Sequence, residues 1–190
     1  MTALRVRDAR APLRGIGIRS PRGQVITPAS PEFGCAPTVI VSAATLTNAA
    51  WHSANDPICI PFTLTQAVTV YRLAQQNGSS PGDNFDIGIY DAAFNRMVSS
   101  GSTAATSSWQ PVDVTDTPLG PGRYYLAFVR DTTTAGRVGY YSWGSSQPLC
   151  AFVGLLDTTT DAFPLPSTLT NMAAAATIVR PPIVGFITRP

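Results

Sequence analysis

The chain has 190 residues and a net charge of +2, and 13% of its residues are charged, among them thirteen Arg, no Lys and a single His. This length suffices for one domain with a full core, so stability requires neither a metal nor a disulfide. The lack of Lys excludes Schiff-base and Walker-type phosphate chemistry, a single His excludes most zinc sites, and no apolar run reaches the ~18 residues that cross a membrane.

Basic charge is concentrated near the N-terminus. Residues 1–30 carry six Arg and one Asp, a net charge of +5, whereas residues 31–190 carry seven Arg and ten acidic residues, a net charge of −3. Five prolines within residues 1–37 forbid a continuous helix and favour extended backbone. We therefore predict an extended basic arm over residues 1–37 and one domain over residues 38–190. The arginines expected to make docking contacts are Arg5, Arg7, Arg10, Arg14, Arg19 and Arg22.

Strand-forming segments begin within the arm and continue into the domain. The short segments 15–18 and 24–26 are suited to adding a strand to another sheet, while residues 38–47 are β-branched and apolar, as in a strand. Residues 58–74 predict further strands, and Pro61 within them indicates an edge or a bulge, because proline cannot donate to the ladder.

Residues 85–91 alternate with a period of two, which predicts a strand with one face buried. The small-residue segment 96–101 then predicts its hairpin partner. The expected inward residues are Phe85, Ile87 and Ile89, and the expected outward ones are Asp86, Gly88 and Tyr90.

The next segments predict a central strand. Residues 109–116 place Val112 and Val114 on one face, and Gly120–Arg123 suits a type II turn in which Gly122 takes a positive φ. Residues 124–129 are apolar on both faces, which is typical of a central or covered strand.

The remaining segments complete an all-β pattern. Strands are expected at 138–144, 149–157, 167–171 with 176–180, and 182–188, and residues 171–176 favour one helical turn. About nine or ten short strands separated by Gly, Pro, Ser and Asp turns predict an antiparallel β-sandwich, jelly-roll-like, with an extended N-terminal arm. The C-terminal apolar segment is suited to strand pairing.

The catalytic inventory is small. His52 is the sole histidine and lies in a turn-like polar stretch, and Glu32 is the sole glutamate and lies in the arm. No nucleophile elbow, P-loop or zinc-protease motif occurs. We therefore expect His52 to be structural, the protein to be no enzyme, and its function to need no cofactor. Three cysteines, Cys35, Cys59 and Cys150, predict buried reduced thiols, with one Cys35–Cys59 or Cys59–Cys150 pair left open.

Two groups of residues could form binding sites, and each group also has an ordinary structural interpretation. Asp83 and Asp86, with Asp91 nearby, supply oxygen ligands of the kind that calcium prefers, although turn chemistry explains aspartates there equally well. Five aromatic residues could stack on sugar rings: Trp51, Trp109, Tyr140, Tyr141 and Trp143. Trp109, Tyr141 and Trp143 are the candidate glycan contacts, although aromatic residues in a sandwich commonly build the core.

The arm has three interpretations. Six arginines could neutralise phosphates, but interleaved aromatics and base-reading motifs are lacking, so nucleic acid is not the expected partner. An organellar transit peptide is Arg-rich and acid-poor in the same way, but Pro12, Gly15, Gly17 and Pro21 break the amphipathic helix that it needs. The third interpretation is an arm that becomes ordered against a partner subunit, with its arginine guanidinium groups pairing with the partner's carboxylates, and it agrees best with the sequence.

Three elements of residues 62–131 resemble a known family: the strand "IGIYD" with its turn, the return ending in "SSG", and the strand pattern L-x-P-G-x-Y-Y-L-A. The segment is similar to β-sandwich domains of tailed-bacteriophage virion proteins, among them fibre, tail-associated and head-decoration proteins. The resemblance implies a virion building block, commonly multimeric, and carries over no catalytic residue.

Together these features predict a non-enzymatic structural subunit of the virion, made in the host cytoplasm and anchored by its arm to capsid or tail proteins. We expect other virion proteins as partners, assembly as a trimer or larger ring, and no membrane partner. The alternative is a carbohydrate-binding module that recognises a host glycan.

Overall fold

The computed structural model describes residues 24–26, 45–78, 82–106, 109–133, 137–142, 156–158, 161–174 and 182–189. These residues form thirteen strands and, within the described ranges, no helix. The strands are β1 (Gln24–Ile26), β2 (Thr45–Ala50), β3 (Ile58–Leu64), β4 (Val68–Gln76), β5 (Asn84–Tyr90), β6 (Arg96–Ser99), β7 (Thr103–Ala104), β8 (Trp109–Leu119), β9 (Gly122–Arg130), β10 (Arg137–Ser142), β11 (Leu156–Thr158), β12 (Met172–Ala174) and β13 (Val184–Arg189).

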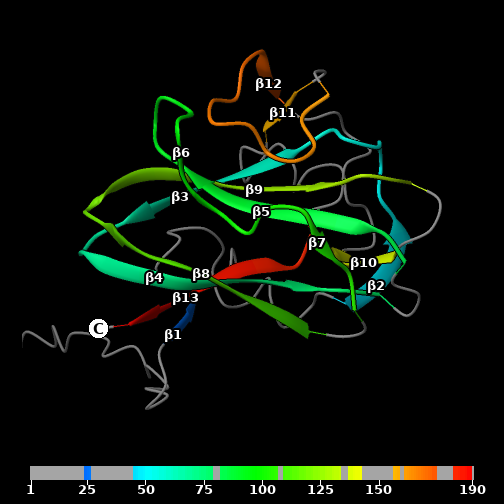
Figure 1. Ribbon diagram of the computed structural model, residues 1–190, viewed down its shortest axis with the longest axis horizontal. Helices are drawn as coiled ribbons and strands as arrows, with labels where there is room; N and C mark the ends of the chain where they lie inside the picture. The colour runs from blue at the N-terminus through cyan, green and yellow to red at the C-terminus, as the bar shows by residue number, and fades with distance from the viewer. Residues whose placement is uncertain are drawn as a thin grey trace, which may run out of the picture.

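The strands form two large antiparallel sheets that face each other (Figure 1). The four-stranded sheet has the order β1-β13-β4-β8, and the seven-stranded sheet has the order β12-β11-β3-β9-β5-β6, with β7 pairing with β5. A two-stranded sheet of β2 and β10 lies at one end. The chain changes sheet between β3 and β4, β4 and β5, β7 and β8, and β8 and β9, as in jelly rolls. This confirms the predicted all-β antiparallel sandwich.

The main core fills the space between the two sheets. Its residues come from both layers, for example Leu73 and Phe186 from the four-stranded sheet and Ile87, Leu126 and Phe128 from the seven-stranded one. Strand β9 lies between β3 and β5 and is buried over residues 125–130, as its apolar residues on both faces predict. Val112 and Val114 pack against this core from β8, which confirms their shared face.

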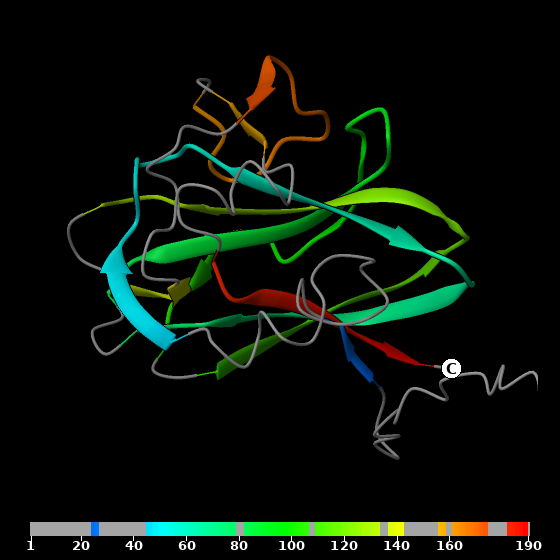
Figure 2. The same ribbon diagram turned by 180° about the vertical axis from the view of Figure 1, so that it is seen from behind.

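A second, smaller cluster, the outer core, covers the other face of the seven-stranded sheet. Residues 161–174, which we call the strap, lie across this face and bury Leu165 and Leu169 against side chains such as Tyr90 and Tyr125. Both views place the strap with β11 and β12 beyond the large sheet (Figure 2). A Cβ atom at Gly88 would lie 3.0 Å from Cδ1 of Leu165, so the absence of a side chain at Gly88 lets Leu165 of the strap pack closely against β5.

The strap corrects one prediction about β5. Its alternating pattern predicts one buried face, but every residue from Phe85 to Tyr90 is buried, because the strap covers the face that carries Asp86, Gly88 and Tyr90. Strand β6 pairs with β5, as predicted for the return segment.

Three further predictions concern local structure. Residues 172–174 form β12, paired with β11, so the helical turn predicted over 171–176 is wrong in its described part. Gly122 already belongs to β9 and does not have a positive φ, so the predicted type II turn is also wrong. Pro61 pairs with Tyr125 of β9, and on the other side of β3 the described part of β11 pairs with Ile58 and Cys59, so the edge or bulge predicted at Pro61 stays a prediction.

Candidate functional site at the edge of the four-stranded sheet

The first and last strands of the chain meet at one edge of the four-stranded sheet. Strand β1 pairs antiparallel with β13, with Gln24 opposite Thr188, Val25 opposite Ile187 and Ile26 opposite Phe186. Both views show β1 beside β13, far from the strap (Figures 1 and 2). The segment 24–26 therefore forms the additional strand that its sequence predicts, and its partner is the C-terminal strand of the same chain.

The six arginines predicted to dock a partner all precede β1. Arg5, Arg7, Arg10, Arg14, Arg19 and Arg22 lie outside the described residues, so their contacts stay predictions. The last of them stands two residues before Gln24 in the sequence. Whatever these side chains contact, the backbone that carries them enters the sandwich at the β13 edge.

The opposite edge of the same sheet is protected against pairing. Strand β8 contains two prolines, Pro111 and Pro118, which offer no N–H to a further strand. Between Thr117 and Asp113 the pairing with β4 shifts register, and such bulges distort an edge. Asp113 is an exposed charge on this strand, its side chain 78% accessible. Prolines, bulges and charges are the features by which natural sheets prevent edge-to-edge association.

Strand β13 lacks the prolines and the acidic charge of β8, although its pairing with β4 also shifts register, between Ile187 and Thr188. Its six residues include no proline and no acid, and they are apolar or small apart from Thr188 and Arg189. It pairs with β4 along its whole length, from Val184 to Arg189, and within the described residues β1 covers residues 186–188 on its other side. Such an apolar edge needs a cover, and three residues of β1 supply it.

The pairing of β1 is close to energetic balance. Ordering the backbone of three residues costs about 3–6 kcal/mol, at about 1–2 kcal/mol each. Three residue pairs return about 1.5–4.5 kcal/mol if each contributes one hydrogen bond worth about 0.5–1.5 kcal/mol. These two backbone terms therefore overlap in size, and contacts beyond the backbone pairing decide how firmly β1 is held.

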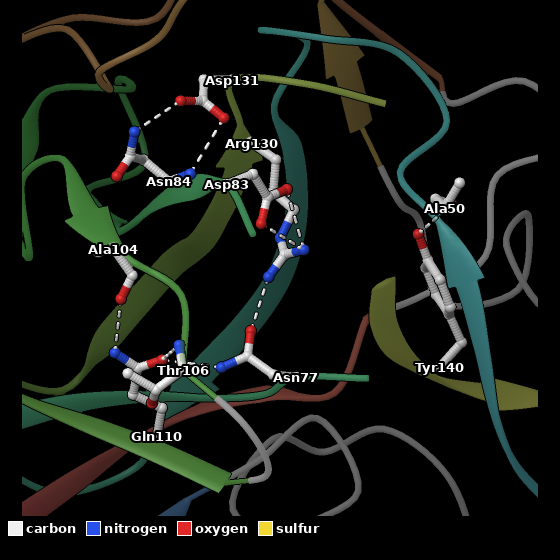
Figure 3. Close-up of polar contacts among 10 residues, drawn as sticks. All are labelled: Ala50, Asn77, Asp83, Asn84, Ala104, Thr106, Gln110, Arg130, Asp131 and Tyr140. Carbon is white, nitrogen blue, oxygen red and sulfur yellow. Dashed lines mark hydrogen bonds and ion pairs between the residues drawn. The ribbon is translucent and has the colours of Figure 1, made fainter. Parts of the chain in front are cut away.

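A buried ion pair stabilises the other end of the sandwich (Figure 3). The side chains of Arg130, at the end of β9, and Asp83 are both fully buried, and Nη1 of Arg130 lies 3.0 Å from each carboxylate oxygen. Nη2 of Arg130 donates to Oδ1 of Asn77 at 2.6 Å. Burial raises the pKa of Asp83 and lowers that of Arg130, and each charge partly offsets the shift of the other.

This network continues into β8. Nδ2 of Asn77 donates to Oε1 of Gln110 at 2.8 Å, and the same oxygen accepts the backbone N–H of Thr106. Nε2 of Gln110 in turn donates to the carbonyl of Ala104 (Figure 3). The end of β4, the start of β8 and the end of β9 are thus joined through side chains.

The aspartates considered as calcium ligands face different partners. Asp83 pairs with Arg130, whereas Asp86 is buried under the strap and accepts hydrogen bonds from Ser99, Ser100 and the backbone N–H of Leu165. Burial raises the pKa of Asp86, opposed by these donors. Within the described ranges no three His, Cys, Asp or Glu side chains gather as metal ligands. A cation at Asp83 would have to compete with the guanidinium.

The exposed Asp91 serves its hairpin. Its Oδ1 accepts the backbone N–H groups of Ala93 and Asn95 at 2.8 and 2.9 Å. The bond from the Asn95 backbone is the main reason that the pKa of Asp91 is lowered. This is the turn chemistry that the sequence offers as the alternative to calcium binding.

The aromatic residues divide between the core and undescribed positions. Trp51 and Tyr140 are 2% and 3% exposed and stack in the main core, so neither can stack on a sugar. Trp109 is partly buried at the start of β8. Tyr141 lies in β10 opposite Leu46, but its side chain and all of Trp143 lie outside the described residues, so a shared aromatic groove stays a prediction.

His52 packs beside the main core. Its ring lies edge-on to Trp51, with centroids 4.6 Å apart. Burial lowers its pKa, and the charge of Asp56 opposes that shift. A neutral imidazole in contact with a core tryptophan agrees with the structural role expected for it.

Sequence reasoning missed the polar network, although part of its signal was present. Tyr124, Leu126 and Phe128 alternate along β9 toward the main core, and the same parity continues to Arg130. An arginine at an inward position requires a buried carboxylate or amide partner. The identity of that partner depends on loop placement, which alternation does not encode.

Comparisons with known proteins identify no relative: no family model, no curated protein and no solved structure matches this chain. Among the described residues no helix is long and apolar enough to cross a membrane.

Proposed function

We propose that this chain is a non-enzymatic structural subunit of a tailed-bacteriophage particle, anchored to neighbouring capsid or tail proteins by its N-terminal arm. The observation that carries the proposal is the position of β1. Because β1 pairs with β13 at the edge of the sandwich, the Arg-rich segment before it is tethered to the surface of the folded domain by backbone pairing.

The polar groups of the interior support the same role. Arg130, Asp83 and Asp86 form hydrogen bonds with the protein itself, and these bonds join loops and strands to one another. Side chains used in this way stabilise the sandwich. The likeness of residues 62–131 to virion sandwiches then indicates the kind of assembly in which such a domain serves.

Charge complementarity supports docking through the arm. Residues 1–30 carry a net charge of +5 and residues 31–190 a net charge of −3. Arg forks bind carboxylates in bidentate pairs at subunit interfaces. An arm of this charge is attracted to acidic surfaces, including the body of another subunit.

The test is incorporation into particles of the phage that encodes the chain. Deleting residues 2–22 retains β1 and removes all six arm arginines. We expect the purified variant to fold with an unchanged melting temperature, and its amount in purified particles to fall at least about tenfold, which corresponds to about 1.4 kcal/mol of lost docking energy.

A full-length variant with the six arginines replaced by Gln is the matched control, because it separates charge from length. It should incorporate poorly as well. Wild-type amounts of the truncated protein in particles would refute anchoring by the arm, and absence of the wild-type protein from particles would refute the virion role altogether.

A further inference from the structure

We propose that the edge of β13 is a strand-exchange site that accepts β1 of a second copy of this chain. The inference rests on the proposed structural role and specifies it, because it names the neighbour and the docking surface. In the assembly, residues 24–26 of one subunit would pair with residues 186–188 of another in the register that the single chain already shows.

The two edges of the four-stranded sheet point to this site. The β8 edge carries Pro111, Pro118 and the exposed Asp113, together with a register shift, and is unsuited to a further strand. The β13 edge carries no proline and no acid, although its pairing with β4 also shifts register, between Ile187 and Thr188, and within the described residues β1 pairs with it over residues 186–188. An edge that already pairs with a strand, in a sheet whose other edge carries prolines and an exposed acid, is suited to accepting the same strand from another copy.

The chain between β1 and the rest of the domain is long enough for exchange. Residues 27–44 separate β1 from β2, and a segment of that length reaches at most about 60 Å when fully extended. A compact domain of this size has a radius of gyration of about 15 Å. Strand β1 can therefore reach the β13 edge of an adjacent copy.

A second copy is the occupant that the register favours. Every copy carries both the donor strand and the acceptor edge, so the exchanged pairing reproduces the backbone bonds of the unexchanged one. The basic arm before β1 then lies against the acidic body of the neighbour. If each subunit passes its strand onward, the contact is head-to-tail and closes into a ring when the rotation between subunits allows it.

Exchange must compete with the subunit's own strand. A strand in the same chain as its acceptor edge competes at an effective concentration that is of the order of millimolar for short flexible linkers. Exchange is therefore expected where copies are held close together, as in a particle or in a concentrated solution. Dilute protein is expected to keep β1 on its own β13.

The test uses two full-length proteins that each carry one thiol. In both, Cys35, Cys59 and Cys150 are replaced by Ala. One then carries Val25→Cys, and the other carries Ile187→Cys with a size tag. Directly opposite residues in antiparallel strands are spaced closely enough for a disulfide, and Val25 and Ile187 are such a pair. A disulfide between the two proteins forms there only if a strand has been exchanged.

The proteins are mixed at about 1 mM, the effective concentration that exchange must match, equilibrated and oxidised, and the disulfide-linked heterodimer is measured by non-reducing electrophoresis. The matched control replaces the acceptor with one carrying Thr115→Cys, an exposed position on the β8 edge that leaves Pro111, Pro118 and Asp113 in place. We expect at least ten times more heterodimer with Ile187→Cys than with Thr115→Cys, and melting temperatures show that each variant is folded.

Equal yields from the two acceptors, or no heterodimer with either, overturn strand exchange. Neither result affects the deletion experiment on particles, which would still show whether the arm anchors the subunit. If deletion abolishes incorporation while the thiols do not cross-link, the arm docks on a different protein, and only the identity of the neighbour is wrong.

Discussion

Replacing Arg130 with Met tests whether the interior of the sandwich depends on its buried ion pair. In the wild-type protein the guanidinium carbon of Arg130 lies 6.0 Å from the centre of the Phe128 ring. The substitution keeps a long unbranched side chain above that ring. It removes the partner of Asp83 and the donor to Asn77, and it leaves a buried carboxylate with no opposite charge.

The magnitude follows from the burial of both side chains. Breaking a buried pair by removing one partner costs about 3–5 kcal/mol, because the remaining charge is uncompensated. For a chain of this length, 1 kcal/mol shifts the melting temperature by about 2–4 °C, so the variant should melt about 6–20 °C lower. The matched control is Arg72→Met, because Arg72 pairs with Asp113 on the surface with 41% and 78% of the two side chains exposed. That change should cost no more than about 1 kcal/mol.

The assay is urea unfolding followed by tryptophan fluorescence. Trp51 is 2% exposed and lies edge-on to Phe128 at 5.0 Å, so it reports the core next to the ion pair. Adding Asp83→Asn to the Arg130→Met protein should restore part of the loss, because a neutral amide replaces the stranded charge, with a coupling energy of about 0.5–3 kcal/mol. Equal, small effects of Arg130→Met and Arg72→Met would refute the reasoning.

Two further substitutions test single buried groups. The side chain of Gln75 is fully buried, and neither of its amide atoms has a hydrogen-bond partner. Gln75→Met should therefore stabilise the protein by about 1–3 kcal/mol in the same urea assay. The control Gln76→Met loses the bond to the Asn77 carbonyl and should not stabilise the protein. Burial raises the pKa of Asp86 above its ordinary 3.8, so the folded protein binds a proton more readily than the unfolded one and gains stability as the pH falls through that raised pKa toward 3.8. Asp86→Asn should lack this gain, and melting temperatures of the two proteins that fall in parallel on acidification would contradict it.

Local patterns in the sequence predict what depends on neighbouring residues in the chain. The apolar residues on both faces of β9 predict its central place, and Val112 and Val114 predict the inward face of β8, because alternation and burial are linked directly. The predicted helical turn at 171–176 fails for a different reason. Alanine favours helix, but residues 172–174 pair with β11, and tertiary pairing overrides a weak local preference.

The candidate site is less predictable because its contacts are distant in sequence. The strap buries the second face of β5 from about eighty residues away along the chain, as in the bond from Leu165 to Asp86, and no local pattern in residues 85–91 encodes that cover. Likewise, the sequence predicts that residues 24–26 add a strand to some sheet. Which edge receives it depends on the absence of proline and acid from β13 and on their presence in β8.

The distribution of stabilising contacts indicates where a partner can engage the sandwich without unfolding it. On the β8 side, the bonds from Arg130 through Asn77 to Gln110 join β9, the end of β4 and β8 through two buried side chains and the partly exposed Gln110. Removing β8 would take Gln110 out of that network and leave Nδ2 of Asn77 without its acceptor. On the β13 side, β1 covers three residues of the edge by backbone pairing, and its ordering cost is comparable to what that pairing returns. The strand exchange proposed at β13 would therefore leave the bonds among Arg130, Asn77 and Gln110 in place.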